Sequence, residues 1–160
     1  MNGRSGFTLV ELMVVVSLAA LLLTWGLPAF SAWNQQHKVE GQMAQLYSDL
    51  QYARIHAYGV KVPTGLWWDA QGAYHISEGG YNANGTFNPN ATEIAPPVTP
   101  QPAVSGQQTV SFDGRGLLDP NSAATFWVAS NYGSPTDCVT ISLTNIALGK
   151  MHGGNCQAQQ

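Results

Sequence analysis

The first thirty residues constrain this chain more than any other part of it. A short polar leader, residues 1–6, contains one basic side chain, Arg4, and an apolar run then extends from Phe7 to Phe30. The single acid within this run is Glu11. A helix over 7–30 would be roughly 36 Å long, enough to cross a bilayer core of about 30 Å. The sequence therefore predicts a membrane anchor helix at 7–30.

Arg4 indicates the orientation of such an anchor in the membrane, and Glu11 indicates a polar interaction within it. Basic residues flank the cytoplasmic side of a membrane segment, so Arg4 predicts a cytoplasmic leader and places the rest of the chain on the other side. A carboxylate inside a membrane segment is costly and indicates a function or a partner. Two interpretations of Glu11 are open: the side chain reaches water at the interface, or it pairs with a cation that offsets the cost of its burial.

The start of the run resembles a known targeting signal. Gly6, Phe7, Thr8, Leu9 and Glu11, followed by apolar residues, are similar to the class III signal of type IV prepilins and type II secretion pseudopilins. The resemblance implies that a prepilin peptidase cuts between Gly6 and Phe7 and methylates the new amine of Phe7. It also implies that Glu11 pairs with that amine, on its own chain or on a neighbouring subunit. Unlike a secretory signal peptide, the apolar segment would be retained. The alternative is an anchor helix without processing.

Gly26 and Pro28 interrupt the apolar run near its end. Proline removes one backbone donor and kinks or breaks a helix, so we expect a helix break at Pro28. In type IV pilins a proline here marks helix that loosens in the filament. The other interpretation is that Pro28 only marks the exit from the membrane.

An amphipathic helix is expected over residues 31–58, as the outer half of the same long helix. Its apolar residues recur every three or four positions and form one face: Val39, Met43, Leu46, Leu50, Ala53 and Ala57. Gly59 and Pro63 then end the helical pattern. We expect a β-rich head over 59–160 to pack on this face. The predicted class is α+β, with the pilin fold: a long N-terminal helix packed on an antiparallel β-sheet head.

Strand signals fill most of the expected head. The predicted strands are Thr64–Trp68, Ala73–Ser77, Thr109–Phe112, Thr125–Ala129, Cys138–Leu143 and Ile146–His152. The first two flank the turn Asp69-Ala-Gln-Gly72 and predict a hairpin. Residues 79–106 are rich in Gly, Asn and Pro, which predicts a long surface loop with little regular structure.

The composition describes an exported head with no catalytic signature. Only 9% of the residues are charged, while Gly and Pro number 17 and 9. An oxidising compartment would join Cys138 and Cys156 in a disulfide, whereas two buried free thiols are the alternative.

The sequence shows no catalytic or metal-binding motif. The histidines show no ligand spacing, and no nucleophile elbow, phosphate loop or zinc-protease motif occurs. We expect neither an enzyme nor a cofactor or metal. Asp113 and Asp119 are more typical of turns than of an acid–base pair, and Asp119-Pro-Asn121 falls short of a calcium loop.

Three stretches of the head resemble one branch of the prepilin-like proteins, the GspH/FimT group. They are Leu46–Arg54, Val110–Gly114 and Ile141–His152. The resemblance implies a minor pilin of the inner membrane, with its head in the periplasm, that helps initiate or cap a type IV pilus. Its partners would be the prepilin peptidase, the membrane, and other major and minor pilins or pseudopilins through the N-terminal helix. The alternative is the H-type minor pseudopilin of type II secretion.

A third hypothesis is a DNA-binding minor pilin for natural transformation. Some FimT-like proteins bind DNA through a Gly-Arg-x-Arg element in the last hairpin, and the matching residues here are Gly149-Lys-Met-His152. The candidate contacts are Lys150, His152 and Arg115. Lysine replaces the planar fork of arginine only in part. From residue 59 onward, three basic residues stand against six acidic ones, whereas phosphate binding needs a basic surface. We therefore expect the head not to bind DNA.

Overall fold

The computed structural model describes residues 7–80, 88, 91–119, 122, 124–129 and 133–159. The chain divides into two compact units, Met1–Gln35 and Gln36–Gln160. One helix, α1 (Leu9–Val60), runs through both units, and strands follow it. These strands are β1 (Thr64–Trp68), β2 (Tyr74–Glu78), β3 (Thr92–Val98), β4 (Ser105–Gly106), β5 (Thr109–Phe112), β6 (Ala124–Trp127), β7 (Cys138–Ile141), β8 (Ile146–His152) and β9 (Asn155–Ala158). The predicted α+β class is confirmed.

The end of α1 lies slightly beyond the predicted one. Gly59 was expected to stop the helix, but it is still helical, and α1 ends at Val60. The next residue, Lys61, has a left-handed backbone with φ of 62°, and its N–H donates to the carbonyl of Ala57 at 3.0 Å. This is a left-handed C-terminal cap, which satisfies a carbonyl that the last turn would otherwise leave free.

The helix break expected at Pro28 is not present in the described backbone. α1 is helical from Leu9 to Val60 without interruption, Pro28 included. A proline removes one hydrogen bond from a helix, but the turns on both sides can hold its helical conformation. Loosening of the helix at this position in a filament stays a prediction.

The predicted apolar face of α1 is confirmed as the centre of the core in the unit Gln36–Gln160. All six of its residues are at most 2% exposed: Val39, Met43, Leu46, Leu50, Ala53 and Ala57. They pack against buried side chains from both sheets, including Leu66, Tyr74, Phe112, Phe126 and Ile141. The hydroxyl of Tyr74 also donates to Asp49 Oδ2 at 2.5 Å, which ties α1 to β2 by a polar contact. Burial of its ring and the nearby Asp49 carboxylate raise the pKa of Tyr74.

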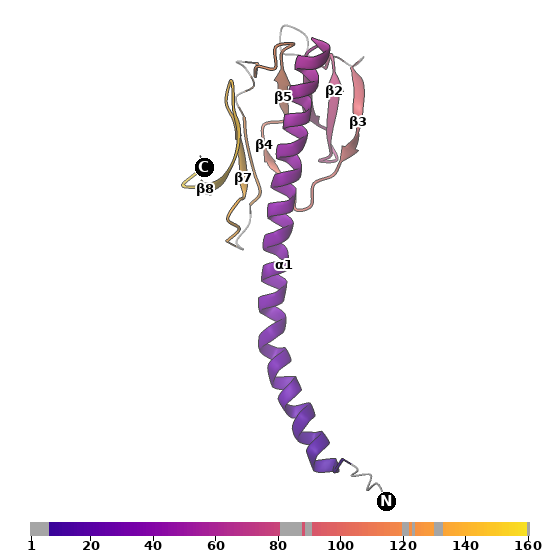
Figure 1. Ribbon diagram of the computed structural model, residues 1–160, viewed down its shortest axis with the longest axis vertical. Coiled ribbons are helices and arrows are strands. Elements are labelled where there is room, and N and C mark those ends of the chain that lie inside the picture. The colour runs from indigo at the N-terminus through magenta and orange to yellow at the C-terminus, as the bar shows by residue number, and fades with distance from the viewer. Residues whose placement is uncertain are drawn as a thin grey trace, which may run out of the picture. The chain divides into compact units, whose positions relative to one another are not determined.

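The head contains two antiparallel sheets, where a single one was expected. The first has the order β3-β2-β1-β5, and the second has the order β4-β6-β7-β8-β9. Figure 1 shows both beside the C-terminal half of α1, with β2 and β3 on one side and β7 and β8 on the other. The predicted hairpin β1–β2 is present, and β7 and β8 form a second hairpin. Each sheet buries one face on the helix, so the helix supplies the middle of a shared core.

The segment 79–106 differs from the expected structureless loop. It contains β3, which pairs with β2, and the short β4, which pairs with β6. Pro96 and Pro97 made a strand improbable, because proline cannot donate to a ladder. β3 lies at the edge of its sheet and its pairing with β2 shifts register. An edge strand needs donors on one side only, so it tolerates both prolines.

Strand β9 was not predicted. It pairs with β8 through a turn in which Gly153 and Gly154 have φ values of 56° and 88°. A Gly-Gly pair between two short runs is a hairpin signal, and the left-handed turn favours glycine. β9 is therefore the last strand of the second sheet and carries Cys156 to its partner.

Candidate functional site

The most distinctive surface of the chain is the apolar side of α1 in the unit Met1–Gln35. Its large apolar side chains are all more than half exposed over the described residues 7–23, from Val14 at 52% to Phe7 at 79%. Among the described residues, α1 is long and apolar enough to cross a membrane, and its most apolar window has a mean hydropathy of 2.2. An exposed apolar surface of this size indicates contact with lipid or with other apolar helices.

Two hydroxyl groups within this segment bond to its own backbone. Ser17 donates to the carbonyl of Met13 at 2.8 Å, and Thr24 donates to that of Leu21 at 2.7 Å. Hydroxyls commonly bond back to the preceding turn in membrane helices, where no water is available to them. The segment therefore presents few unpaired groups to a lipid or to a packed bundle.

Thr8 and Glu11 form the start of the helix. The Glu11 N–H donates to Thr8 Oγ1 at 3.3 Å, and the Leu12 N–H donates to the Thr8 carbonyl at 3.2 Å. Thr8 is thus the N-cap, and Thr8-x-x-Glu11 has the spacing of a capping box. A carboxylate in the first turn also interacts favourably with the positive end of the helix dipole. Sequence reasoning missed this role of Glu11, although the Thr-x-x-Glu signal was there to be read.

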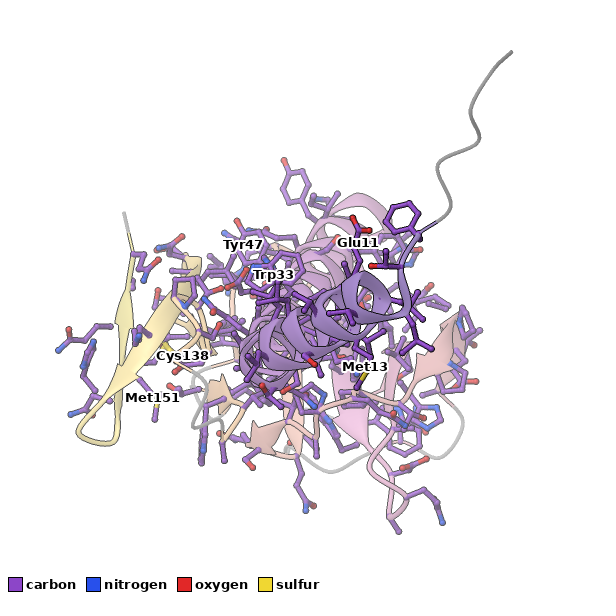
Figure 2. All side chains as sticks on the ribbon, turned by 90° about the horizontal axis from the view of Figure 1, so that it is seen from below. Glu11, Met13, Trp33, Tyr47, Cys138 and Met151 are labelled. Carbon is purple, nitrogen blue, oxygen red and sulfur yellow. A yellow bond between two sulfur atoms is a disulfide. The ribbon has the colours of Figure 1, made fainter. Side chains whose placement is uncertain are left out.

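Glu11 also remains available to a partner. Figure 2 shows its side chain on one side of α1 and that of Met13 on another, as expected for residues two apart in a helix. Glu11 is exposed. Phe7 immediately precedes the N-cap, so its amino group, once freed by cleavage, would lie within one turn of Glu11. Gly6, the predicted cleavage residue, lies outside the described residues.

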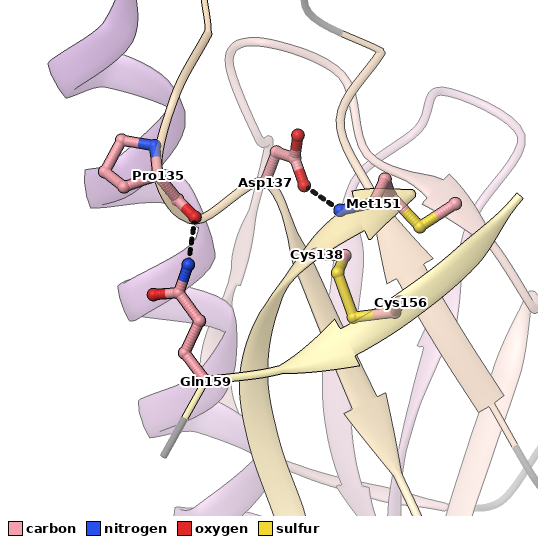
Figure 3. Close-up of a disulfide and its surroundings, with 6 residues drawn as sticks. All are labelled: Pro135, Asp137, Cys138, Met151, Cys156 and Gln159. Carbon is pink, nitrogen blue, oxygen red and sulfur yellow. Dashed lines mark hydrogen bonds between the residues drawn. A yellow bond between two sulfur atoms is a disulfide. The ribbon is translucent and has the colours of Figure 1, made fainter. Parts of the chain in front are cut away.

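The predicted disulfide is present in the second sheet. Cys138 in β7 is joined to Cys156 in β9, with Cα atoms 6.0 Å apart. These strands are not neighbours, because β8 lies between them, and Figure 3 shows the bond beside β8. Gly149 of β8 pairs with Cys138, and a Cβ on it would lie 2.9 Å from the Cys156 sulfur and 2.3 Å from the Gln157 carbonyl oxygen. A glycine is therefore required below the bond.

The residues proposed as DNA contacts do not form a basic patch. Arg115 is in the turn after β5, where its guanidinium pairs with Asp113 at 2.8 Å. Lys150 and His152 lie on β8, and the amide of Met151 between them donates to Asp137 Oδ1 at 2.6 Å (Figure 3). Arg115 is thus already paired with a carboxylate, which disfavours phosphate binding there. The absence of DNA binding stays a prediction.

Asp113 has the turn role that its sequence context indicated. Its Oδ1 accepts hydrogen bonds from the N–H groups of Arg115 and Leu117 at 2.9 and 3.0 Å. Burial alone would raise the pKa of Asp113, but these bonds and the Arg115 charge lower it. The group is fully engaged as an ionised turn residue, an arrangement unlike that of a general acid.

A histidine between two carboxylates lies on the outer face of the first sheet. His75 Nε2 is 3.2 Å from Asp69 Oδ2, and its Nδ1 contacts Glu93. The Trp67 ring stacks on the imidazole with centroids 4.2 Å apart. Burial lowers the pKa of His75, but the hydrogen bonds and charges of Glu93 and Asp69 outweigh it and raise this pKa. Each carboxylate meets a different ring nitrogen, which suits an imidazolium with two donors. Within the described residues, no group of three His, Cys, Asp or Glu could hold a metal ion.

Known proteins resemble this chain in its N-terminal motif and in its fold. The model of the prokaryotic N-terminal methylation motif matches residues 1–27. The crystal structure of the type IV minor pilin FimU from Pseudomonas aeruginosa PAO1 is similar with a TM-score of 0.54, at 18% identity. The match covers 74% of this chain and 92% of that one. The chain has the pilin fold. No curated protein matches the sequence significantly.

This chain is thus prepilin-like at its N-terminus and pilin-like in its fold. The methylation motif covers the leader, the cap residues Thr8 and Glu11, and most of the apolar run. These are the residues from which the sequence predicted a prepilin. Cleavage after Gly6 and methylation of Phe7 are proposals for this chain.

Proposed function

We propose that this chain is a minor pilin of the inner membrane that helps initiate or cap a type IV pilus. The observation that carries the proposal is the methylation motif at residues 1–27 leading directly into a helix whose apolar side chains are exposed. The pilin fold and the likeness to FimU, a type IV minor pilin, support it. The segment would anchor the chain in the membrane first and pack against other subunits afterwards.

Processing would create the charge pair that assembly uses. A prepilin peptidase would cut between Gly6 and Phe7 and methylate the Phe7 amine. The new cation would lie one residue before the N-cap, while Glu11 lies in the first turn. In an apolar bundle of helices an unpaired carboxylate is costly, and a cation with hydrogen-bonding geometry offsets that cost. Glu11 would therefore favour a subunit docked in register with its neighbours.

The head is suited to the periplasm. A disulfide such as Cys138–Cys156 forms and persists in an oxidising compartment, and Arg4 on the leader side predicts that the leader stays in the cytoplasm. The chain would then cross the membrane once before it enters the filament. The same arrangement would serve an H-type minor pseudopilin, because the two kinds of protein share the anchor and the type of head.

A clean deletion of the gene separates the two machines. We would measure sheared surface pili and twitching motility together with the set of secreted exoproteins. The proposal predicts loss of pili and motility with normal secretion, restored by the gene in trans. Loss of secretion with normal pili would assign the chain to type II secretion instead. If neither output changes, the proposed role in pilus assembly is contradicted.

A further inference from the structure

Arg54 on α1 has no acidic partner within the part of the chain that the structure describes. Its Nε donates to the carbonyl of Gly116 at 2.9 Å, a contact that links the helix to the turn after β5. Its two terminal nitrogens have no hydrogen-bond or ion-pair partner among the residues that the structure describes. The side chain is half-buried. These terminal nitrogens are not buried, so they can donate to a group from outside the chain.

These donors line an open pocket of about 370 Å³. The pocket, here called the arginine pocket, is lined by Gln51, Arg54, Ile55, Tyr58, Arg115 and Gly116. All of these residues belong to the unit Gln36–Gln160. Gly116 has a φ of 74°, and a Cβ there would lie 3.4 Å from the Tyr58 Cβ, so the turn packs closely on the helix. The pocket is therefore built by the fixed contact between α1 and this turn.

The arginine pocket is cationic although the chain as a whole is acidic. Lys61 Nζ lies 3.7 Å from the centroid of the Tyr58 ring, next to the pocket. Together with Arg54 and Arg115, three of the six basic residues of the chain gather here. The neighbouring acid is Asp113, which already pairs with Arg115. The site thus favours an anionic group.

The surroundings indicate which kind of molecule supplies that group. Tyr52, Ile55 and Tyr58 are spaced by three along α1 and are 45, 68 and 60% exposed. A residue spacing of three places them along one side of the helix. A nucleic-acid backbone would need a row of cations and would gain little from an exposed isoleucine. A protein segment with an acid beside apolar side chains satisfies both parts of this surface.

We propose that the arginine pocket binds a carboxylate of an acidic, apolar segment on a neighbouring protein subunit. The terminal nitrogens of Arg54 receive the carboxylate as a bidentate pair, and Tyr52, Ile55 and Tyr58 cover the apolar residues beside it. This inference deepens the proposed function, since the neighbour is another subunit of the filament. It is a contact of the head, separate from the Phe7–Glu11 pair.

The test measures binding to the isolated full-length protein in detergent. The chain has three arginines, Arg4, Arg54 and Arg115, so the Nε–Hε signal of Arg54 can be assigned by NMR. The probes are acetyl-Ala-Glu-Leu-amide, its glutamine counterpart and inorganic phosphate. We expect the glutamate peptide to shift the Arg54 signal and to bind about fivefold more tightly than the glutamine peptide, because charge-assisted pairs are the stronger ones.

Two variants distinguish binding from a structural role of Arg54. Arg54→Lys keeps the charge but loses the fork, and we expect the affinity for the glutamate peptide to fall about fivefold. Ile55→Ser changes an exposed side chain, so folding is unaffected and binding of the same peptide, followed on the Arg54 signal, weakens about twofold to threefold. Equal binding of the glutamate and glutamine peptides would overturn the proposal, and so would stronger binding of phosphate. Neither result would affect the filament role, which the gene deletion tests independently.

Discussion

In the proposed function, Glu11 combines two tasks at one position. It is the third residue of α1, where its N–H is held by Thr8 Oγ1, and it is the acid of the apolar run. A capping residue needs only an acceptor, whereas a partner for a free amine needs a charge. Because glutamine is also found at the third position of capping boxes, the two tasks can be separated by substitution.

Replacing Glu11 is expected to impair assembly through loss of charge. Glu11→Gln loses the charge but keeps the capping geometry, whereas Glu11→Ala loses both the charge and the capping side chain. Both variants should be cleaved normally. Each should enter filaments about tenfold less than the wild type, which corresponds to roughly 1.4 kcal/mol. The measurement is the amount of each variant in sheared pili, with the membrane level as control. Normal incorporation of Glu11→Gln would show that the charge pair is not needed.

The pair of carboxylates around His75 makes a pH-dependent contribution to stability. Burial opposes protonation, but Glu93 and Asp69 raise the pKa of His75 above its ordinary value. The contribution is therefore complete below the unfolded pKa of about 6.5 and is lost as the pH rises through the higher folded pKa. We expect His75→Gln to lower the free energy of unfolding more at about pH 5.5 than at about pH 9.

Urea unfolding of the wild type and His75→Gln at both pH values measures this difference. The matched control is His152→Gln, an exposed histidine at the end of β8. A loss of equal size at both pH values would mean that the imidazolium does not hold these strands.

At the scale of elements, the C-terminal hairpin depends on the bond that crosses it. Cys138 and Cys156 are 18 residues apart, so removing the bond as a double serine variant should cost about 3 kcal/mol in the chain-entropy account. β9 is an edge strand, and its backbone pairs with β8. Hydrogen exchange should show loss of protection in β9 first, while β1 and β2 remain protected. Unchanged exchange in β9 would contradict this dependence.

Gly149 should be intolerant of any side chain for the same reason. A Cβ there would meet the Gln157 carbonyl and the Cys156 sulfur, so Gly149→Ala is expected to destabilise by about 1–3 kcal/mol. Gly59→Ala serves as the control, since no atom lies within 4 Å of its Cβ position and its backbone is helical. Thermal unfolding with free-thiol quantification checks both variants. Full stability and full oxidation of Gly149→Ala would contradict the packing described.

Local patterns predicted those elements whose residues carry their own signal. The apolar face of α1 and the strands β1, β5 and β8 were predicted with the observed positions, because their periodicity and turns are written in adjacent residues. β3 was missed because proline argues against a strand unless its edge position is known. The contact of Arg54 with Gly116 joins residues 62 apart, which no local pattern reveals.

At the scale of the whole molecule, the two compact units carry different surfaces. The unit Met1–Gln35 carries the methylation motif and the exposed apolar helix. The unit Gln36–Gln160 buries the continuation of the same helix under two sheets and exposes the arginine pocket. In the proposed function, the first unit would anchor the chain in the membrane and then pack in the filament. The second unit would bind specific neighbouring subunits. The first role depends on the mature N-terminus that the motif predicts.

The most direct test is therefore the mass of the N-terminal peptide of this protein recovered from sheared pili. We predict that it begins at Phe7 with a methylated amine, and that Gly6→Ala leaves the precursor uncut in the membrane. An intact Met1 terminus in the wild type, or an unchanged mature terminus in Gly6→Ala, would contradict the account.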